Sequence, residues 1–455
     1  MYGVSSPDDE QLASKIIGYE KQLGVIVNIT DKGSLEHVYI RLLGFYTQPY
    51  VTSDQWQTYI STYTNGTYGG SDYIHHQVQV FGILVKLFQS KSVGENGLRY
   101  LVAWSIYRQL VTYTVPKLLL GKGHAGYRNV KKSCYKLVRK VMSLAVISPY
   151  FKSKVPPEAI YEAKRMVAKI RSAFREGLES SSWLTDRYRE VALRKLDNIT
   201  AYVGSPGNQL DPVFVETLYK PYPDAHPSRL FPTWIKALSL SCHYIWADQT
   251  TFLYEEELVN AYYIPNYNTL VIPTGLIQPP FFYTYGPLGL SYGGLGMIVA
   301  HEFMHAFDVE GITFDEAYKP WGSTDIIKEY TKRAMCLRQS HRSALSFTAR
   351  QEVLNDTADS ENLADLVGTV TAYSAFASLS ASHGTLAGLG MSAERLFFVN
   401  HCVKRCHQKS RLTARYAPYR SRCIVPLMNM PEFSRAYGCS AGEPMNPRKK
   451  CSFWS

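Results

Sequence analysis

The sequence has no apolar run of the roughly 18 residues that a membrane-spanning helix needs. Its start, residues 1–10, has neither the basic region nor the apolar region of a secretory signal. It also has no low-complexity tract and no internal repeat, while 45% of its 455 residues are hydrophobic and 19% are charged. These absences exclude a disordered chain and a repeat array, and the length favours a globular protein of roughly two or three domains.

Acidic residues are fewer than basic ones: the chain has 38 Asp and Glu and 49 Lys and Arg, which gives a net charge of +11. Such a balance suits acidic peptides, anionic glycans or nucleic acid. The basic stretches, residues 131–140, 405–422 and 448–450, contain no nucleic-acid-binding motif. We therefore expect a solvated basic surface and no nucleic-acid partner.

Cysteines and glycosylation sequences indicate the compartment. Five of the eight cysteines lie after residue 400. Four asparagines stand in Asn-X-Ser/Thr acceptor sequences: Asn28, Asn65, Asn198 and Asn355. Both features favour an oxidising, extracellular setting. Without a signal at the start, they predict an incomplete N-terminus, so we expect a secreted glycoprotein or the ectodomain of a type II protein whose plasma-membrane anchor is absent here.

The spacing of apolar residues predicts a mostly helical fold with a small β component, an α+β architecture. Residues 80–235 are largely helical in pattern, with helices beginning near Pro156 and Trp183. Residues 260–264 and 269–272 form a predicted β-hairpin, and another helix is expected to begin near Gly296. We expect a helical N-terminal lobe over residues 1–235 and a C-terminal lobe over residues 236–455.

The last of these helices carries a candidate metal site. His301 and His305 are separated by one helical turn, so both imidazoles can reach a single ion from one face of the helix. Glu302 completes a His-Glu-X-X-His motif, in which the glutamate is the expected general base. The motif therefore predicts zinc-dependent hydrolysis.

A catalytic zinc ion takes three protein ligands and one water, so the motif needs a third ligand. Asp325 stands at one spacing that such sites use, but it also suits the start of a helix. Glu361 and Asp365 share a helical face one turn apart, so one carboxylate could bind the ion while the other orients a ligand imidazole. By spacing alone, a solvated acidic helix face is the simpler interpretation of this pair, and the alternatives stay open.

Five segments carry a resemblance to a known family, in the same order along the chain. They are Val259-Asn-Ala-Tyr, Ile272-Pro-Thr-Gly-Leu-Ile-Gln-Pro-Pro-Phe-Phe, Tyr292-Gly-Gly-Leu-Gly-Met-Ile-Val-Ala-His-Glu-Phe-Met-His-Ala-Phe-Asp, Glu361-Asn-Leu-Ala-Asp and Met445-Asn-Pro-Arg-Lys-Lys-Cys-Ser-Phe-Trp. The chain resembles the neprilysin and endothelin-converting-enzyme family of zinc endopeptidases, peptidase family M13, most strongly over residues 250–455. The resemblance implies a two-lobed zincin of the gluzincin type, with a thermolysin-like catalytic lobe and a helical lid lobe.

The resemblance also assigns roles residue by residue. It implies one Zn²⁺ ion with three protein ligands: His301, His305 and Glu361. Glu302 would act as the catalytic acid and base on the zinc-bound water. Asp365 would steady His301, and Asp308 would support the ligands similarly.

Substrate-binding roles follow from the same resemblance. Asn260 and Ala261 match an edge-strand motif that holds the substrate backbone, and Arg422 matches an arginine that binds a substrate carbonyl. Tyr416 stands where the family has a histidine that donates to the oxyanion, and loss of one such donor typically lowers turnover ~10²- to 10³-fold. We therefore expect an endopeptidase that hydrolyses oligopeptides or, as the alternative, a catalytically impaired peptide-binding or decoy homologue.

One further position departs from the family pattern, and the cysteines match that pattern in part. Arg405 stands where the family has a tryptophan in a hydrophobic pocket, which weakens the implied preference for cleavage before bulky hydrophobic residues. Cys336 and Cys451 match a disulfide of the family. Three other cysteines match positions whose family partners lie nearer the N-terminus, where this chain has none: Cys134, Cys406 and Cys439.

Overall fold

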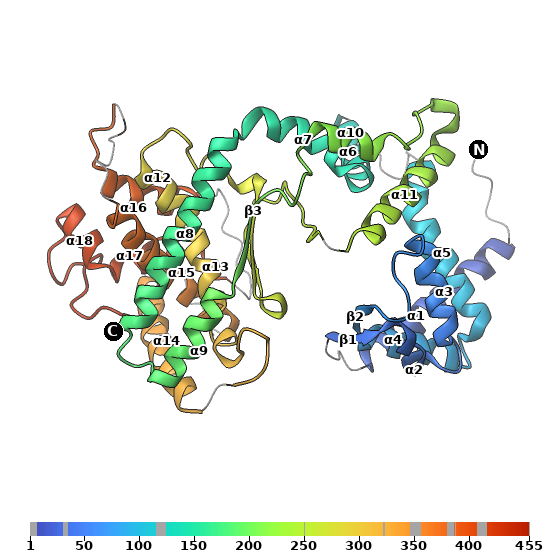
Figure 1. Ribbon diagram of the computed structural model, residues 1–455, viewed down its shortest axis with the longest axis horizontal. Helices are drawn as coiled ribbons and strands as arrows, with labels where there is room; N and C mark the ends of the chain where they lie inside the picture. The colour runs from blue at the N-terminus through green and yellow to red at the C-terminus, as the bar shows by residue number, and fades with distance from the viewer. Residues whose placement is uncertain are drawn as a thin grey trace. The chain divides into compact units, whose positions relative to one another are not determined.

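The computed structural model describes residues 7–30, 35–114, 124–249, 251–321, 324–345, 356–379, 386, 388–406 and 416–454. Two compact units form, Met1–Val146 with Glu216–Thr251 and Ile147–Val215 with Phe252–Ser455 (Figure 1). Residues 235 and 236, between which a domain boundary is expected, both lie in the helix Leu230–Ala247 of the first unit. Within the described ranges, no helix combines the length and the apolar character that crossing a bilayer requires.

The first unit consists of helices around a two-stranded antiparallel sheet. Its elements are α1 (Pro7–Asn28), β1 (Leu35–Tyr39), η1 (Ile40–Leu42), α2 (Gly44–Thr47), α3 (Ser53–Tyr63), β2 (Tyr73–Gln77), α4 (Val78–Gln89), α5 (Gly94–Thr114), α6 (His124–Val141), η3 (Pro227–Arg229) and α11 (Leu230–Ala247). One hydrophobic cluster joins Ile26 to Leu87 and Leu101, and another joins Val38 to Ile60. Two helices have residues in both units: α7 (Ser143–Lys154) and α10 (Pro212–Tyr219).

The second unit is also mostly helical and contains a three-stranded sheet. Its elements are α8 (Pro157–Ser180), α9 (Asp186–Asp197), β3 (Thr200–Gly204), β4 (Tyr262–Ile264), η4 (Pro265–Tyr267), β5 (Thr269–Pro273), η5 (Thr274–Leu276), α12 (Leu288–Ser291), the π-helical turn η6 (Tyr292–Gly296), α13 (Met297–His305), η7 (Gly311–Thr313), α14 (Thr324–Leu345), α15 (Asp356–Ala377), α16 (Ala393–Val403), α17 (Tyr419–Met428) and α18 (Pro431–Tyr437). The mostly helical α+β fold class is confirmed.

The sheet of the second unit has the order β3-β5-β4. All five residues of β5 are buried, which explains its continuous Thr-Leu-Val-Ile-Pro apolar run. The strand β4 pairs antiparallel with β5 through η4, where Asn268 adopts the left-handed conformation (φ 45°). The predicted hairpin is therefore confirmed, and β4 is the outermost strand of this sheet.

A bundle of three helices, α8, α13 and α15, forms the core beside this sheet (Figure 1). The helix α8 begins at Pro157, where a missing N–H costs nothing, and its buried residues recur at helical spacing from Ala159 to Leu178. Phe174 on α8 has no exposed surface and its ring contacts those of Phe303 and Phe307. This packing holds α13 in place from one side.

The other helix that packs against α13 is α15, and a glycine permits their close approach. A Cβ atom at Gly368 would lie 2.8 Å from the backbone nitrogen of His301 and 2.9 Å from its Cα. Only glycine therefore fits at this crossing point. The contact brings the first turns of α15 beside the histidines of α13.

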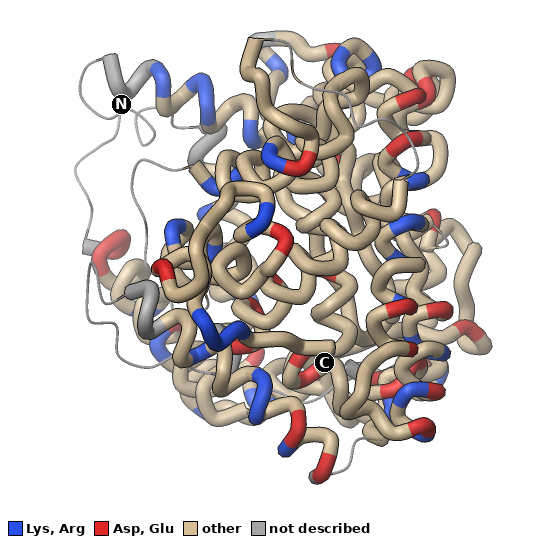
Figure 2. The backbone as a smooth tube through the Cα atoms, turned by 90° about the vertical axis from the view of Figure 1, so that its left-hand side faces the viewer, with Lys and Arg blue, Asp and Glu red and all other residues tan. Residues whose placement is uncertain are grey.

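Charged residues are distributed along the whole described backbone. Figure 2 shows basic and acidic positions along the backbone, although some helices carry charge of one sign, such as α6, whose charged residues are all basic. The net positive charge is thus spread over many elements of the described chain.

Candidate metal centre

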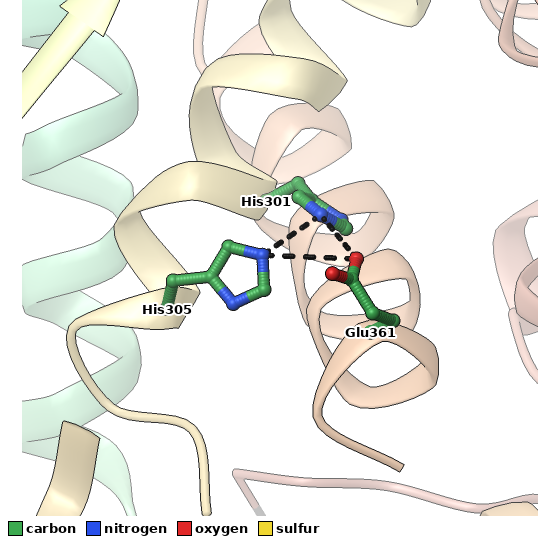
Figure 3. Close-up of side chains that lie close together, drawn as sticks. All are labelled: His301, His305 and Glu361. Atoms are coloured by element: carbon green, nitrogen blue, oxygen red, sulfur yellow. Dashed lines mark hydrogen bonds and ion pairs between the residues drawn. The ribbon is translucent and has the colours of Figure 1, made fainter. Parts of the chain in front are cut away.

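The two histidines of α13 point toward one another (Figure 3). The Nε2 atoms of His301 and His305 are 3.1 Å apart, and the side chains are 8% and 15% exposed. Two neutral imidazoles at this distance present lone pairs to a common point only if their other ring nitrogens carry the protons. The orientation of each ring therefore depends on the partner of its Nδ1 atom.

Glu361 enters from α15 and completes a three-residue group (Figure 3). Its Oε2 atom lies 3.3 Å from Nε2 of His301 and 3.8 Å from Nε2 of His305. In a tetrahedral zinc site with bonds near 2.0 Å, neighbouring ligand atoms are about 3.3 Å apart. The donor atoms of this group therefore fit a zinc ion in both chemistry and spacing. The other candidate, Asp325, lies in the first turn of α14 with its side chain 85% exposed.

Asp308 holds His305 from the outer side. Its Oδ2 atom is 2.9 Å from Nδ1 of His305, while its Oδ1 atom accepts hydrogen bonds from the backbone N–H groups of Glu310 and Gly311. Burial alone would lower the pKa of His305, but Asp308, Glu302 and Glu361 raise that pKa to about 9. Three carboxylates therefore surround this imidazole with negative charge.

Asp365 lies one turn after Glu361 and holds His301. Its Oδ1 atom is 2.9 Å from Nδ1 of His301, and its carboxylate also accepts two hydrogen bonds from Arg422, at 2.6 and 2.9 Å. Burial alone would raise the pKa of Asp365, but Arg405, Arg422 and His301 hold it well below its usual range. The carboxylate of Asp365 therefore stays ionised and can orient the imidazole of His301.

Glu302 occupies the position between the two histidines in sequence, and its side chain lines the same cavity. Its Oε2 atom accepts a hydrogen bond of 3.0 Å from the backbone N–H of Tyr263, the second residue of β4. Burial raises the pKa of the Glu302 carboxyl, against the opposing effect of His305 and His301. A carboxylate with a raised pKa is suited to accept and release a proton.

The cavity beside these residues has a volume of about 780 Å³. Asn260 and Ala261 line it just before β4 begins, and Tyr416 and Arg422 line it from the C-terminal part of the unit. The guanidinium of Arg422 lies 4.7 Å from the centre of the Tyr416 ring. All the site residues considered from sequence except Asp325 and the cysteines thus lie around or directly behind one cavity.

Sequence reasoning missed two features of the site. It identified Arg405 as a substitution but not its partner, which is Oδ1 of Asp365 at 2.8 Å. It gave Lys404 no role, although this residue also lines the cavity. The neighbouring Lys404-Arg405 pair directly after an apolar helix was the available signal.

Two disulfides occur in the second unit. Cys336–Cys451, which the resemblance implies, is present, and so is Cys402–Cys423, for which no pairing was predicted. The remaining cysteines form no disulfide in the structure: Cys134, Cys242, Cys406 and Cys439. Three of the asparagines in acceptor sequences are described, whereas Asn355 lies outside the described residues.

Comparisons with known proteins agree with the geometry. Residues 1–206 and 260–453 match the two models of peptidase family M13. Neprilysin-2 of Caenorhabditis elegans is 27% identical over 72% of this chain and 47% of its own length. Endothelin-converting enzyme 1 of Rattus norvegicus is 29% identical over 71% of this chain and 44% of its own length. The chain thus spans about half the length of these relatives. Among solved structures, the zinc metalloprotease Zmp1 of Mycobacterium tuberculosis has the same fold, with a TM-score of 0.69 and 20% identity over 100% of this chain and 74% of its own.

Proposed function

The chain belongs to peptidase family M13, and from this premise we propose that its second unit is the catalytic part of a zinc-dependent endopeptidase that hydrolyses oligopeptides. The observation that carries the proposal is the convergence of two carboxylate-held imidazoles and Glu361 beside Glu302, at the wall of a single cavity. Residues from α13 and α15 would hold one Zn²⁺ ion: His301, His305 and Glu361. When bound, the ion supplies Lewis-acid polarisation of water and of a peptide carbonyl.

Glu302 would move the protons of the reaction. Its carboxylate would accept a proton from the attacking water, and it would deliver that proton to the amine nitrogen as the peptide C–N bond breaks. The raised pKa of this buried carboxyl supports the first step, since a stronger base accepts the proton more readily. The hydrogen bond from the Tyr263 N–H would keep the carboxylate at the cavity wall.

The substrate backbone would lie along the outer edge of the hairpin. Asn260 and Ala261 continue into β4, the outermost strand of the sheet, so a peptide could add to this edge through main-chain hydrogen bonds. Arg422 and Tyr416 would donate hydrogen bonds to the carbonyl oxygen that becomes negatively charged. The side chain beside the scissile bond would enter the part of the cavity that Phe281, Met297 and Arg405 line, which is not the uniformly apolar pocket that a preference for bulky hydrophobic residues requires.

We also infer an extracellular location. Two disulfides in the second unit support it, because such bonds persist in oxidising compartments. The glycosylation of Asn28, Asn65 and Asn198 belongs to the same proposal and can be checked by mass spectrometry of the secreted chain.

The experiment is a cleavage assay of the 455-residue chain with short quenched-fluorescence peptides, with and without a zinc chelator. Cleavage should depend on zinc, and Glu302→Gln should lower kcat by about 10²- to 10⁴-fold while the zinc content stays the same. The control is Glu329→Gln, which changes an exposed glutamate of α14 paired with Arg333. Unchanged cleavage by Glu302→Gln would contradict the proposal. Zinc and peptide binding without cleavage by the unmodified chain would favour the decoy alternative.

A further inference from the structure

Two basic side chains form part of the wall of the cavity that holds the candidate metal centre. Lys404 and Arg405 follow the last residue of α16 and both line the cavity together with His301 and Glu302. The Lys404 ammonium donates hydrogen bonds to the backbone carbonyls of Gly293 (2.6 Å) and Gly294 (3.2 Å). These carbonyls belong to η6, the turn that leads directly into α13, so the ammonium is fixed beside the helix of the two histidines.

The basic groups of this wall have few acidic partners of their own. Arg405 and Arg422 share the single carboxylate of Asp365, which also holds the imidazole of His301. Among the described residues, the hydrogen-bond partners of the Lys404 ammonium are both neutral carbonyls. The carboxylate of Asp365 is therefore shared between two guanidinium groups, of which Arg422 also lies 3.9 Å from Glu361.

Arg405 has an unused donor inside the protein. Its side chain is 10% exposed, and its Nε atom is buried without a hydrogen-bond partner among the described residues. A buried charged donor without a partner is unfavourable, so it marks a position where an acceptor from a ligand would be stabilising. Burial, and then Arg405, lower the pKa of the Lys404 ammonium well below its usual range, so an anionic ligand beside it would stabilise its charged form.

The rest of this wall is apolar and adjoins the reaction centre. Met297 and Ile298 precede His301 by one helical turn on α13, and Phe281 lines the same region. One turn of helix is about 5.4 Å, so the wall begins one side chain away from the first histidine. A peptide residue next to the scissile bond would reach it, with its methylene groups against Met297 and its end near Arg405.

We propose that this pocket selects a peptide with an acidic residue, glutamate in particular, directly beside the scissile bond, and that Arg405 and Lys404 bind its carboxylate. The inference depends on the proposed peptidase function. Glutamate fits better than aspartate because its longer stem spans the apolar wall before the carboxylate meets the basic groups. A charge-assisted hydrogen bond to a buried donor should favour Glu over the isosteric Gln about ten- to a hundredfold in kcat/KM.

The test uses quenched peptides that are identical except for Glu, Gln, Leu or Lys at the position before or after the cleaved bond. The chain should cleave the Glu peptide about ten- to a hundredfold faster than the Gln peptide at one of the two positions. Lys404→Met and, separately, Arg405→Gln should reduce this ratio toward one, with the Leu peptide gaining relative to the Glu peptide. Lys328→Met, which changes a lysine 77% exposed on α14, is the matched control and should keep the ratio.

A binding measurement separates failure of this inference from failure of the proposed function. The Glu302→Gln chain, loaded with zinc, is titrated with the fluorescent Glu and Gln peptides, so that affinity is measured without turnover. Tighter binding of the Glu peptide that is lost in Glu302→Gln/Lys404→Met supports the pocket even if no peptide is cleaved. Equal cleavage and equal affinity for Glu and Gln peptides, or a preference that both basic-site variants retain, overturns the inference while leaving zinc-dependent cleavage intact.

Discussion

Replacement of Asp365 by asparagine removes one negative charge from the centre of the site and leaves its shape almost unchanged. The carboxylate is 1% exposed and has four close contacts, one with His301 (2.9 Å), one with Arg405 (2.8 Å) and two with Arg422 (2.6 and 2.9 Å). An asparagine amide has one acceptor oxygen, and its NH₂ group would face donors. Two buried guanidinium groups would then lack their shared counter-charge.

The expected losses follow from these contacts. Removal of one partner from a buried ion pair costs about 3–5 kcal/mol of unfolding free energy. Loss of a carboxylate that orients a ligand imidazole lowers metal affinity by about 10- to 100-fold. Stability is measured by urea unfolding of the metal-free chain, and zinc affinity by competition with a chromophoric chelator.

A matched control separates the two effects. Asp359 is another buried carboxylate of α15, and it pairs with Arg338 (Nε–Oδ2 2.6 Å) away from the histidines. Asp359→Asn should destabilise the fold but leave zinc affinity unchanged. If Asp365→Asn also left zinc affinity unchanged, the carboxylate would not orient His301 in the way the geometry indicates.

Two further predictions concern stability. Burial raises the pKa of Glu256 to about 7, although Ser205 opposes this with a hydrogen bond. Because this pKa is above the unfolded value of about 4.3, the folded state binds the proton more tightly, so the contribution to stability is fully present below about pH 4 and is lost as the pH rises through 7. The free energy of unfolding should therefore fall by roughly 3 kcal/mol between about pH 4 and pH 7, and Glu256→Gln should remove this fall. Urea unfolding across this pH range measures the effect. If the variant had the same pH profile as the unmodified chain, the assignment would be refuted. Replacing both cysteines of Cys336–Cys451, which are 115 residues apart, should cost about 4–5 kcal/mol, more than the roughly 3 kcal/mol for Cys402–Cys423 at a separation of 21. Unfolding experiments that reverse this order would contradict the loop-length reasoning.

The local elements around the site could be predicted from sequence because each has a strong periodic signal. Spacing placed His301 and His305 on one helical face, and the structure has them on α13. The β-rich segments at 260–264 and 269–272 predicted the hairpin that is formed by β4 and β5. Glu361 and Asp365 were predicted on one helical face, and both lie on α15. These are short-range patterns, which local chain geometry largely determines.

The remainder depends on contacts between segments that are distant in sequence. Nothing in the spacing of Glu361 indicates that α15 crosses α13, since the crossing depends on Gly368 against the backbone of His301. Arg405 could be seen as unusual, but its pairing with Asp365 across 40 residues could not be read from either residue alone. The Cys402–Cys423 disulfide and the division into two compact units are of the same kind, because both depend on how helices pack rather than on how they form.

Gly368 at this helix crossing affects how the candidate metal centre would take up a cation. At Gly368 the backbones of α15 and α13 are in direct contact, with no side chain between them. The main chains from which Glu361, His301 and His305 extend are thus held close together, and the torsions of these three side chains set the final separation of their donor atoms. An arriving cation would meet two helices already in place, so uptake would require shedding of hydration water and adjustment of side chains rather than movement of the helices.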